Sequence, residues 1–116
     1  NWNGLVITIK DLIDKRRKIM AKGYWVSCYR AIKNADAMGE YAKLAGPAVA
    51  SGGGTFLARG GRIEAFEAGV KERTVVVEFP SFEQALATHD GEAYQAALVK
   101  LEGAVERDFR VIEGID

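Results

Sequence analysis

Residues 74–86, with the sequence TVVVEFPSFEQAL, encode a strand followed directly by the start of a helix. The β-branched and aromatic side chains before the proline suit a packed strand. Pro80 has no backbone N–H to donate and therefore ends that strand. Ser81 stands three residues before Gln84, which is the spacing of a helix capping box. We therefore predict a strand over residues 73–79 and a helix that begins after Ser81.

Residues 23–30, GYWVSCYR, form the first predicted strand of the globular part. Successive side chains of a strand point to opposite faces of its sheet. One face carries Trp25, Ser27 and Tyr29. The other face carries Tyr24, Val26, Cys28 and Arg30. Both faces are largely apolar, and this pattern is typical of a central strand that is covered on both sides.

The middle of the chain predicts a helix and a hairpin. Asn34 is expected to cap the helix, and Gly46-Pro47 to break or kink it. The glycines at 52–54 follow this helix and precede a strand, the reverse of the order in a phosphate-binding loop. We therefore assign them to a turn. Residues 56–67 predict two short strands around a two-residue Gly60-Gly61 turn.

The C-terminal part predicts two short helices and a closing strand over residues 107–115. Asp90-Gly91 interrupts the apolar helical pattern that starts at Phe82, and Asp90 is expected to cap the second helix. The resulting order is β-α-β-β-α-β with an extra hairpin. This order predicts an α+β fold of the ferredoxin-like, split βαβ class.

Helices in this arrangement cover only one face of the sheet. The other face also carries aromatic and aliphatic residues, and so large an exposed apolar patch is unusual for a monomer. A symmetric pair of chains with their sheets face to face would cover it. We therefore expect a homodimer that forms a dimeric α+β barrel.

The composition narrows the classes of function. The 116 residues fit one domain, and no apolar run approaches the roughly 18 residues that span a bilayer. Cys28 is the only cysteine, which favours a reducing, cytoplasmic location. Basic residues are scattered after the first 19 positions, so nucleic-acid binding is disfavoured. One histidine, one cysteine and dispersed carboxylates give no metal-ligand spacing, and no cofactor motif is present.

Residues 1–19 are expected to be a leader that comes from a tag or an upstream extension, ahead of a single domain over residues 20–116. Met20-Ala21-Lys22 resembles a translational start just before the first strand. Residues 5–9, LVITI, have strand composition. We expect them to add to an exposed sheet edge or to lie on a neighbouring chain.

Several segments together resemble a known family: MAKGYWVSCYR, GGGTFLARGGRIEAFE, RTVVVEFPSFEQAL, EAYQAAL and the closing VIEG. They are similar to small bacterial proteins of the domain of unknown function 1330 family, within the dimeric α+β-barrel superfamily. The resemblance covers residues 20–114. It implies a ferredoxin-like protomer and a homodimeric barrel, and it implies no established activity. Relatives commonly carry an aromatic-Asp-Ser-Pro-Glu-Tyr run where this chain has THDGEAY at 88–94.

Glu78 and His89 are the candidate catalytic residues. Glu78 interrupts an apolar strand, and a carboxylate there needs a partner, which we predict to be Arg62 or Arg73. The arginine would hold an anionic or carbonyl ligand and Glu78 would move a proton. His89 is the sole histidine and could transfer protons near neutral pH. The candidate ligand-binding residues are Arg62, Arg73, Tyr24, Tyr94 and Glu113.

Each of these residues also has a structural interpretation. Glu78 and its arginine could form an ion pair or a charged rim of the dimer interface, Asp90 is explained as a cap, and His89 as a surface residue between helices. Two functions therefore stay open. One is a dimer that binds a small organic ligand between sheet and helices, which includes cofactor-independent enzymes like the monooxygenases and isomerases of the superfamily. The other is a non-catalytic assembly or regulatory module with a filled barrel.

Overall fold

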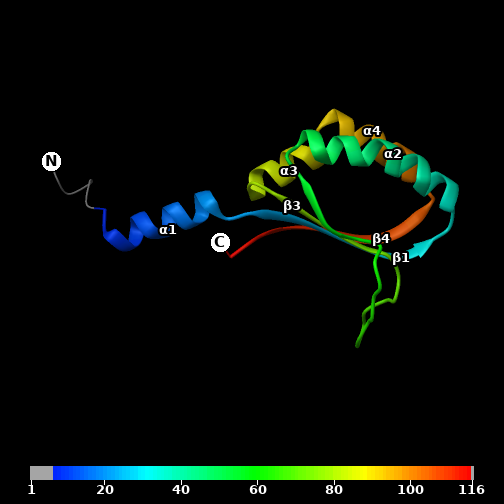
Figure 1. Cartoon of the computed structure of the whole chain (residues 1–116), viewed down its shortest axis with the longest axis horizontal. Coiled ribbons are helices and arrows are strands. Elements are labelled where there is room, and N and C mark those ends of the chain that lie inside the picture. The colour runs from blue at the N-terminus through cyan, green and yellow to red at the C-terminus, as the bar shows by residue number, and fades with distance from the viewer. Residues whose placement is uncertain (1–6, 116) are drawn as a thin grey trace.

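The computed structural model describes residues 7–115, and the side chains of all of these except residues 17–20. Figure 1 shows the elements of this part of the chain. In order, they are α1 (Ile9–Met20), β1 (Gly23–Ile32), α2 (Ala35–Ser51), β2 (Thr55–Arg59), β3 (Thr74–Phe79), α3 (Phe82–Asp90), α4 (Glu92–Leu101) and β4 (Val105–Glu113).

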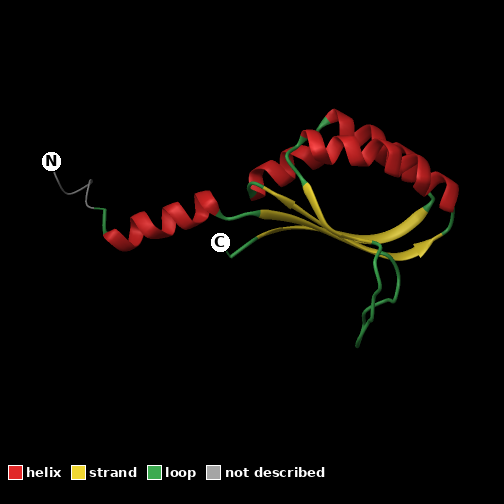
Figure 2. Cartoon of the chain, in the orientation of Figure 1, coloured by secondary structure: helices red, strands yellow, loops and turns green. Residues whose placement is uncertain are grey.

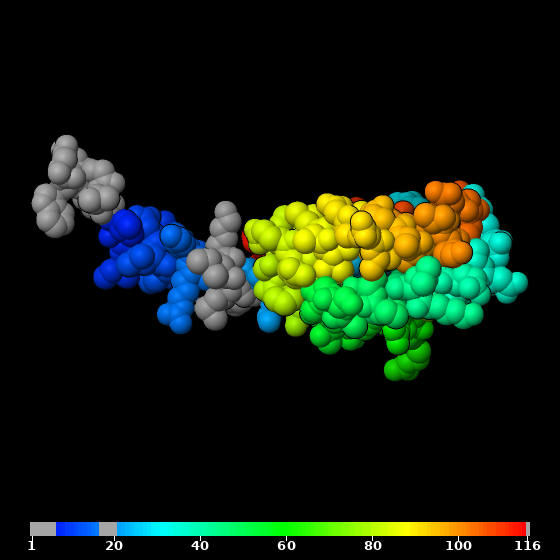
Figure 3. Space-filling view, turned by 90° about the horizontal axis from the view of Figure 1, so that it is seen from above, coloured from blue at the N-terminus to red at the C-terminus, as the bar shows by residue number. Residues whose placement is uncertain are grey.

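The strands form one antiparallel sheet in the order β2-β3-β1-β4. The connections β1-α2-β2 and β3-α3-α4-β4 interleave two βαβ units, which is the split βαβ arrangement. The predicted α+β, ferredoxin-like class is therefore confirmed. Helices α2, α3 and α4 lie together over one face of the sheet (Figure 2). In the view onto this helical layer, α2 runs beside α3 and α4 (Figure 3).

The core lies between the helical layer and the sheet. Trp25, Ser27 and Tyr29 of β1 point into it and are each 3% exposed, as their alternation predicts. Trp25 is central, because its ring packs against Phe79 and Tyr94 at centroid distances of 4.8 and 4.6 Å. Its indole Nε1 donates a hydrogen bond of 2.9 Å to the backbone oxygen of Ala85. Burial of this aromatic cluster joins β1 to α3 and α4.

Two of the predicted helix caps are confirmed. The Asn34 side chain accepts a hydrogen bond from the backbone N–H of Ala37, and Ser81 Oγ accepts one from Gln84. The Gln84 side chain does not complete a reciprocal capping box, since it donates instead to the backbone oxygen of Gly52, at 2.9 Å. This bond ties the start of α3 to the end of α2.

The predicted cap at Asp90 is wrong. Asp90 is the last residue of α3, and Gly91 occupies the N-cap position of α4 without a side-chain capping bond. The predicted break at Gly46-Pro47 is also wrong, because α2 continues to Ser51. A proline inside a helix costs about 3 kcal/mol. Buried Ala45, Ala48 and Val49 hold both halves of α2 against the core and offset this cost.

The predicted hairpin within residues 56–67 is wrong in its second half. Only β2 forms, and it pairs with the valine-rich β3, which gives Phe56 a place against the core. Residues 60–73 form an irregular loop that stands off the sheet on the side away from the helices (Figure 1). The glycines at 52–54 make the predicted turn, in which Gly53 adopts φ of 81°.

The N-terminal segment is helical and not a strand. Ile7 and Thr8 are outside any strand and Ile9 begins α1, while residues 5 and 6 of the predicted strand lie outside the described residues. A capping box that the strand prediction overlooked starts this helix. Thr8 Oγ1 accepts from the Asp11 N–H, and Asp11 Oδ2 accepts from the Thr8 N–H. Helix α1 extends away from the sheet and adds to no sheet edge (Figure 1).

No helix in the described part of the chain combines the length and the apolar character that crossing a membrane requires.

Candidate functional site

A cavity of about 60 Å³ lies between α2 and the sheet. Its helical wall is the inner stripe of α2, formed by Ala42, Ala45, Gly46 and Val49. Gly46 has no side chain, and a Cβ atom built there would meet nothing within 4 Å. The small residues of this stripe therefore leave the core unfilled where α2 crosses the sheet.

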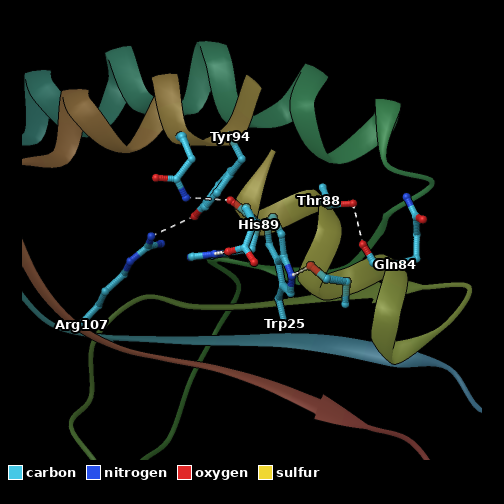
Figure 4. Close-up of polar contacts among 9 residues, drawn as sticks. Trp25, Gln84, Thr88, His89, Tyr94 and Arg107 are labelled. Carbon is cyan, nitrogen blue, oxygen red and sulfur yellow. Dashed lines mark hydrogen bonds and ion pairs between the residues drawn. The ribbon is translucent and has the colours of Figure 1, made fainter. Parts of the chain in front are cut away.

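Arg107 of β4 supplies the charge at this cavity. Its Nη2 donates a hydrogen bond of 2.9 Å to the hydroxyl of Tyr94 on α4, toward which it points in Figure 4. Nη1 lies 3.3 Å from the hydroxyl of Tyr41 and 3.2 Å from that of Ser27. The Tyr41 and Tyr94 hydroxyls are hydrogen-bonded to each other at 2.6 Å. Hydroxyl groups from one strand, β1, and from two helices, α2 and α4, thus converge on the guanidinium of β4.

Aromatic rings complete the surroundings of Arg107. Its guanidinium carbon lies 4.7 Å from the centroid of Phe109, 5.3 Å from that of Tyr41 and 5.6 Å from that of Tyr29. These distances are within the range of cation–π attraction. The rings stabilise the partly buried cation and shield part of it from water.

Positive charge dominates the cavity wall. Arg59, Arg73 and Arg107 all line it, and its described lining contains no aspartate or glutamate. Arg59 is exposed and lies over the ring of Phe56, with its guanidinium carbon 4.3 Å from the ring centroid. The cavity is therefore a cationic, partly apolar site.

The protonation states follow from burial and from this clustering. Burial raises the pKa of Tyr94 well above its usual range, and the neighbouring Tyr41 raises it further, against the opposing effect of Arg107. Burial also raises the pKa of Tyr29. Burial alone would lower the pKa of Arg107, but Tyr94 and Tyr41 raise it above its ordinary value. Tyr94 and Tyr29 are therefore neutral phenols beside a permanent cation.

Alkaline pH is expected to weaken the fold through Tyr94. Because its pKa is raised in the folded state, the unfolded chain releases the phenol proton first once the pH exceeds about 10. The free energy of unfolding should then fall by about 1.4 kcal/mol per pH unit from this residue. In urea unfolding, the stability difference between the wild type and Tyr94→Phe should shrink above about pH 10. A difference that stays constant from about pH 8 to about pH 11 would contradict the assignment.

The candidate residues named from the sequence lie in different parts of the structure. Arg73 lines the cavity, and Tyr94 lies behind its wall as a hydrogen-bond partner of Arg107. Tyr24 and Glu78 form a cross-strand pair on the opposite, open face of the sheet, where Tyr24 donates to Glu78 Oε2 at 3.4 Å. Arg62 lies on the exposed 60–73 loop.

Glu113, also named from the sequence, is exposed at the end of β4. No single site therefore contains all the residues proposed from the pattern alone.

The predicted ion pair of Glu78 with Arg62 or Arg73 is wrong for the isolated chain. None of the ion pairs among the described residues includes Glu78, whose partner is the Tyr24 hydroxyl. Glu78 is only partly buried in the single chain, so its charge does not require a cationic partner there. Arg73 points instead to the helical side, where it lines the cavity.

His89 lies at the edge of the core and not in the cavity wall. Its Nδ1 is 2.9 Å from Asp90 Oδ1, so the carboxylate that was expected to cap a helix orients the imidazole instead. The ring lies 5.4 Å from the centroid of Tyr94, its neighbour in Figure 4. It lies at the same distance from the centroid of Phe109. His89 therefore contacts the aromatic residues that surround Arg107 without belonging to the lining of the cavity.

Arg107, Tyr41 and Ser27 were missed as site residues by the sequence reasoning. The signal for Arg107 was present, because it is in phase with Phe109 and Val111 on the inward face of the closing strand. An arginine in that phase must enter the core. The sequence contained no comparable signal for the position of Tyr41, since its neighbours depend on how α2 crosses the sheet. No group of three potential metal ligands occurs among the described side chains.

Comparison with known proteins places the chain in a family. Residues 22–115 match the family described as domain of unknown function DUF1330. A search of curated proteins finds no match. Among solved structures, a protein of unknown function from Rhodopseudomonas palustris is similar, with a TM-score of 0.63 and 18% identity. The match covers 97% of this chain and 95% of that one.

Two further structures share the fold. A dimeric ferredoxin-like protein of unknown function from Thermobifida fusca has a TM-score of 0.54 and 16% identity, over 83% of this chain and 92% of that one. A candidate antibiotic biosynthesis monooxygenase from Caulobacter crescentus has a TM-score of 0.52 and 10% identity, over 90% and 99% of the two chains. At these identities the likeness concerns the fold alone. The family match spans most of the chain, and the protein therefore belongs to the DUF1330 family, whose function is unknown.

Proposed function

We propose that the protein binds a small organic ligand in the cavity between α2 and the sheet. The observation that carries this proposal is a cavity at the place where a packed core would otherwise close, lined by a cluster of hydroxyls around Arg107. Binding sites typically combine an apolar wall with a few convergent polar groups. The described lining has this composition.

A catalytic role is the finer form of the same proposal. A fixed cation with neutral hydroxyl donors can stabilise negative charge that develops on a substrate oxygen. Such stabilisation is what a cofactor-independent isomerase or monooxygenase would require, and the similar Caulobacter protein is a candidate monooxygenase. Fold likeness by itself does not fix the reaction, so ligand binding is the function to test first.

Filling the cavity should abolish binding. Gly46→Leu places a side chain into the open space on the inner stripe of α2. Gly39→Leu is the matched control, because Gly39 is an exposed position on the same helix and a Cβ there also meets nothing. Native mass spectrometry with a metabolite mixture should detect a bound species with the wild type and Gly39→Leu, and none with Gly46→Leu.

Two outcomes would count against the proposal. If the wild type retains no metabolite, the results would favour the alternative function, a non-catalytic assembly or regulatory module that binds no ligand. If Gly46→Leu retains the same bound mass as the wild type and circular dichroism confirms that it is folded, the ligand site lies elsewhere.

We also propose that the protein assembles as a homodimer through the open face of its sheet. Val26, Val76 and Ile112 lie on this face, away from the helices. The similar Thermobifida protein is dimeric. Sheet-to-sheet packing of two copies would bury these side chains.

Sedimentation equilibrium at micromolar concentration should report two chains for the wild type. Val76→Asp places a charge in the middle of the proposed interface and should yield monomers. Ala93→Asp, on the exposed surface of α4, should remain dimeric. A monomeric wild type would remove this proposal, and a dimeric Val76→Asp would move the interface to another surface.

A further inference from the structure

We infer that the ligand of the cavity is a small organic carboxylate and that Arg107 is the residue that binds its charged group. This inference rests on the proposed ligand-binding function and names its ligand class. Its basis is a partly buried guanidinium that has hydroxyl partners but no counter-ion.

The absence of a counter-ion at Arg107 is the first observation. Among the described residues, all four hydrogen-bond partners of Arg107 are hydroxyls, and no carboxylate forms an ion pair with it. Buried charges in proteins are normally paired, because removing an unpaired charge from water is costly. Hydroxyl dipoles and aromatic faces reduce this cost but leave the net charge. An anion in the adjacent cavity would neutralise it.

The free donors at the site are the second observation. The Tyr41 and Tyr94 hydroxyls take one hydrogen bond each from Nη1 and Nη2, so they occupy the end of the guanidinium. No acceptor for Nε is present among the described residues. Every fully buried side-chain nitrogen and oxygen of these residues has a partner, so the unpartnered Nε must be reachable from solvent. Nε and the second Nη2 hydrogen form the fork that binds a carboxylate through both oxygens.

The hydroxyl protons add to this excess of donors. One proton lies between Tyr41 and Tyr94, which leaves the other phenol O–H free to donate. Because Tyr94 stays neutral when buried, it remains a donor throughout the neutral pH range. A site that offers donors and positive charge, with its hydroxyl lone pairs already engaged by Arg107, is complementary to an acceptor-only group. An ionised carboxylate is such a group.

The size of the cavity selects among anions. A volume of about 60 Å³ is well below the 300–1,000 Å³ or so of sites for drug-sized ligands. It accommodates a carboxylate with a short carbon chain, or the carboxylate end of a longer molecule. The apolar wall of Ala45, Val49 and Val77 suits the carbon atoms of such a ligand. Exposed Arg59 and the nearby Arg73 would raise the local concentration of anions at the cavity.

The test compares propionate with propionamide, which has nearly the same shape and no charge, and with inorganic phosphate. Each is titrated at constant ionic strength into isotopically labelled protein, and the backbone resonances of residues 42–49 are followed. Propionate should shift these resonances to saturation. Propionamide should bind at least about 10-fold more weakly, since the loss of one charge-assisted hydrogen bond corresponds to roughly 10- to 100-fold in affinity.

Variants of β4 assign the effect to Arg107. Arg107→Met should weaken propionate binding by about 10- to 100-fold. Arg107→Lys keeps the charge but loses the planar fork, and it should bind propionate with intermediate affinity. It also serves as the second variant if Arg107→Met does not fold. Arg110→Met is the matched control, because Arg110 lies on the open face of the same strand, paired with Asp108, and should bind like the wild type.

The outcomes separate this inference from the proposed function. Equal binding of propionamide and propionate, or undiminished propionate binding by folded Arg107→Met and Arg107→Lys, would overturn the carboxylate inference and leave the cavity as a ligand site. Tighter binding of phosphate than of propionate would replace the carboxylate by a phosphoryl group. Absence of propionate binding, together with a metabolite retained by the wild type and lost in Gly46→Leu, would reject the inference alone.

Discussion

Replacement of Trp25 by alanine is expected to lower the free energy of unfolding by about 3–5 kcal/mol, the usual range for truncation of a buried aromatic side chain. Trp25 is 3% exposed and its ring contacts Phe79, Tyr94 and Phe109. The substitution also leaves the backbone oxygen of Ala85 without its indole donor. For a domain of this size such a loss is a large part of the total stability.

Trp25→Phe separates packing from the hydrogen bond. It preserves much of the aromatic volume but removes the donor to Ala85, so it should cost less than half as much as Trp25→Ala. Urea unfolding followed by circular dichroism measures both variants. If Trp25→Ala cost less than about 1 kcal/mol, the core would not be organised around this residue as described.

Gly23→Ala is expected to destabilise the protein by about 3 kcal/mol, at the upper end of the range for overpacking. A Cβ atom at this position would lie 2.6 Å from Phe82 Cα and 2.7 Å from Phe82 N, and it would also overlap the backbone oxygen of Ser81. These are backbone atoms at the start of α3, which cannot move aside as a flexible side chain could. The start of β1 and the start of α3 would have to separate.

Gly61→Ala is the control for Gly23→Ala. Gly61 is exposed in the 60–73 loop, and a Cβ atom there meets nothing within 4 Å. Its stability should therefore stay within about 0.5 kcal/mol of the wild type, as for most surface substitutions. Equal thermal midpoints for Gly23→Ala and Gly61→Ala would show that the close approach of β1 to α3 is not a constraint.

Sequence features that act over a few residues, such as strand alternation and helix caps, predicted the fold correctly wherever contacts distant in sequence did not override them. The alternation of Trp25, Ser27 and Tyr29 and the caps at Asn34 and Ser81 depend on nearest neighbours in the chain, and the structure confirms them. The errors arose where a distant contact decided the conformation. Pro47 stays in a helix because the inner face of α2 is buried.

Two further predictions from local composition were wrong: the hairpin over residues 56–67 and the strand over residues 5–9. Residues 62–67 have strand composition but form no strand, because β2, which was expected to pair with them, pairs with β3. At α1, two local signals competed, and the Thr8–Asp11 capping box prevailed over the β-branched composition that precedes it.

The candidate site was predicted only in outline. An arginine and tyrosines between sheet and helices were expected, and Arg73 and Tyr94 do lie there. The alternation of strand residues already places Glu78 and Arg73 on opposite faces of the sheet, but only the packed structure shows that the helices and the cavity lie on the face of Arg73. The sequence also could not place Tyr41 beside Tyr94, since their contact joins residues on two helices that are far apart in the sequence.

The most direct test of the site is the Nε–H resonance of Arg107 in the presence of propionate. Loss of one arginine Nε signal in Arg107→Lys assigns the resonance. If a carboxylate binds the free edge of this guanidinium, the signal should move downfield and saturate with the same affinity as the backbone shifts of α2, while the Arg110 signal stays in place. A stationary Arg107 signal at saturating propionate would contradict the account.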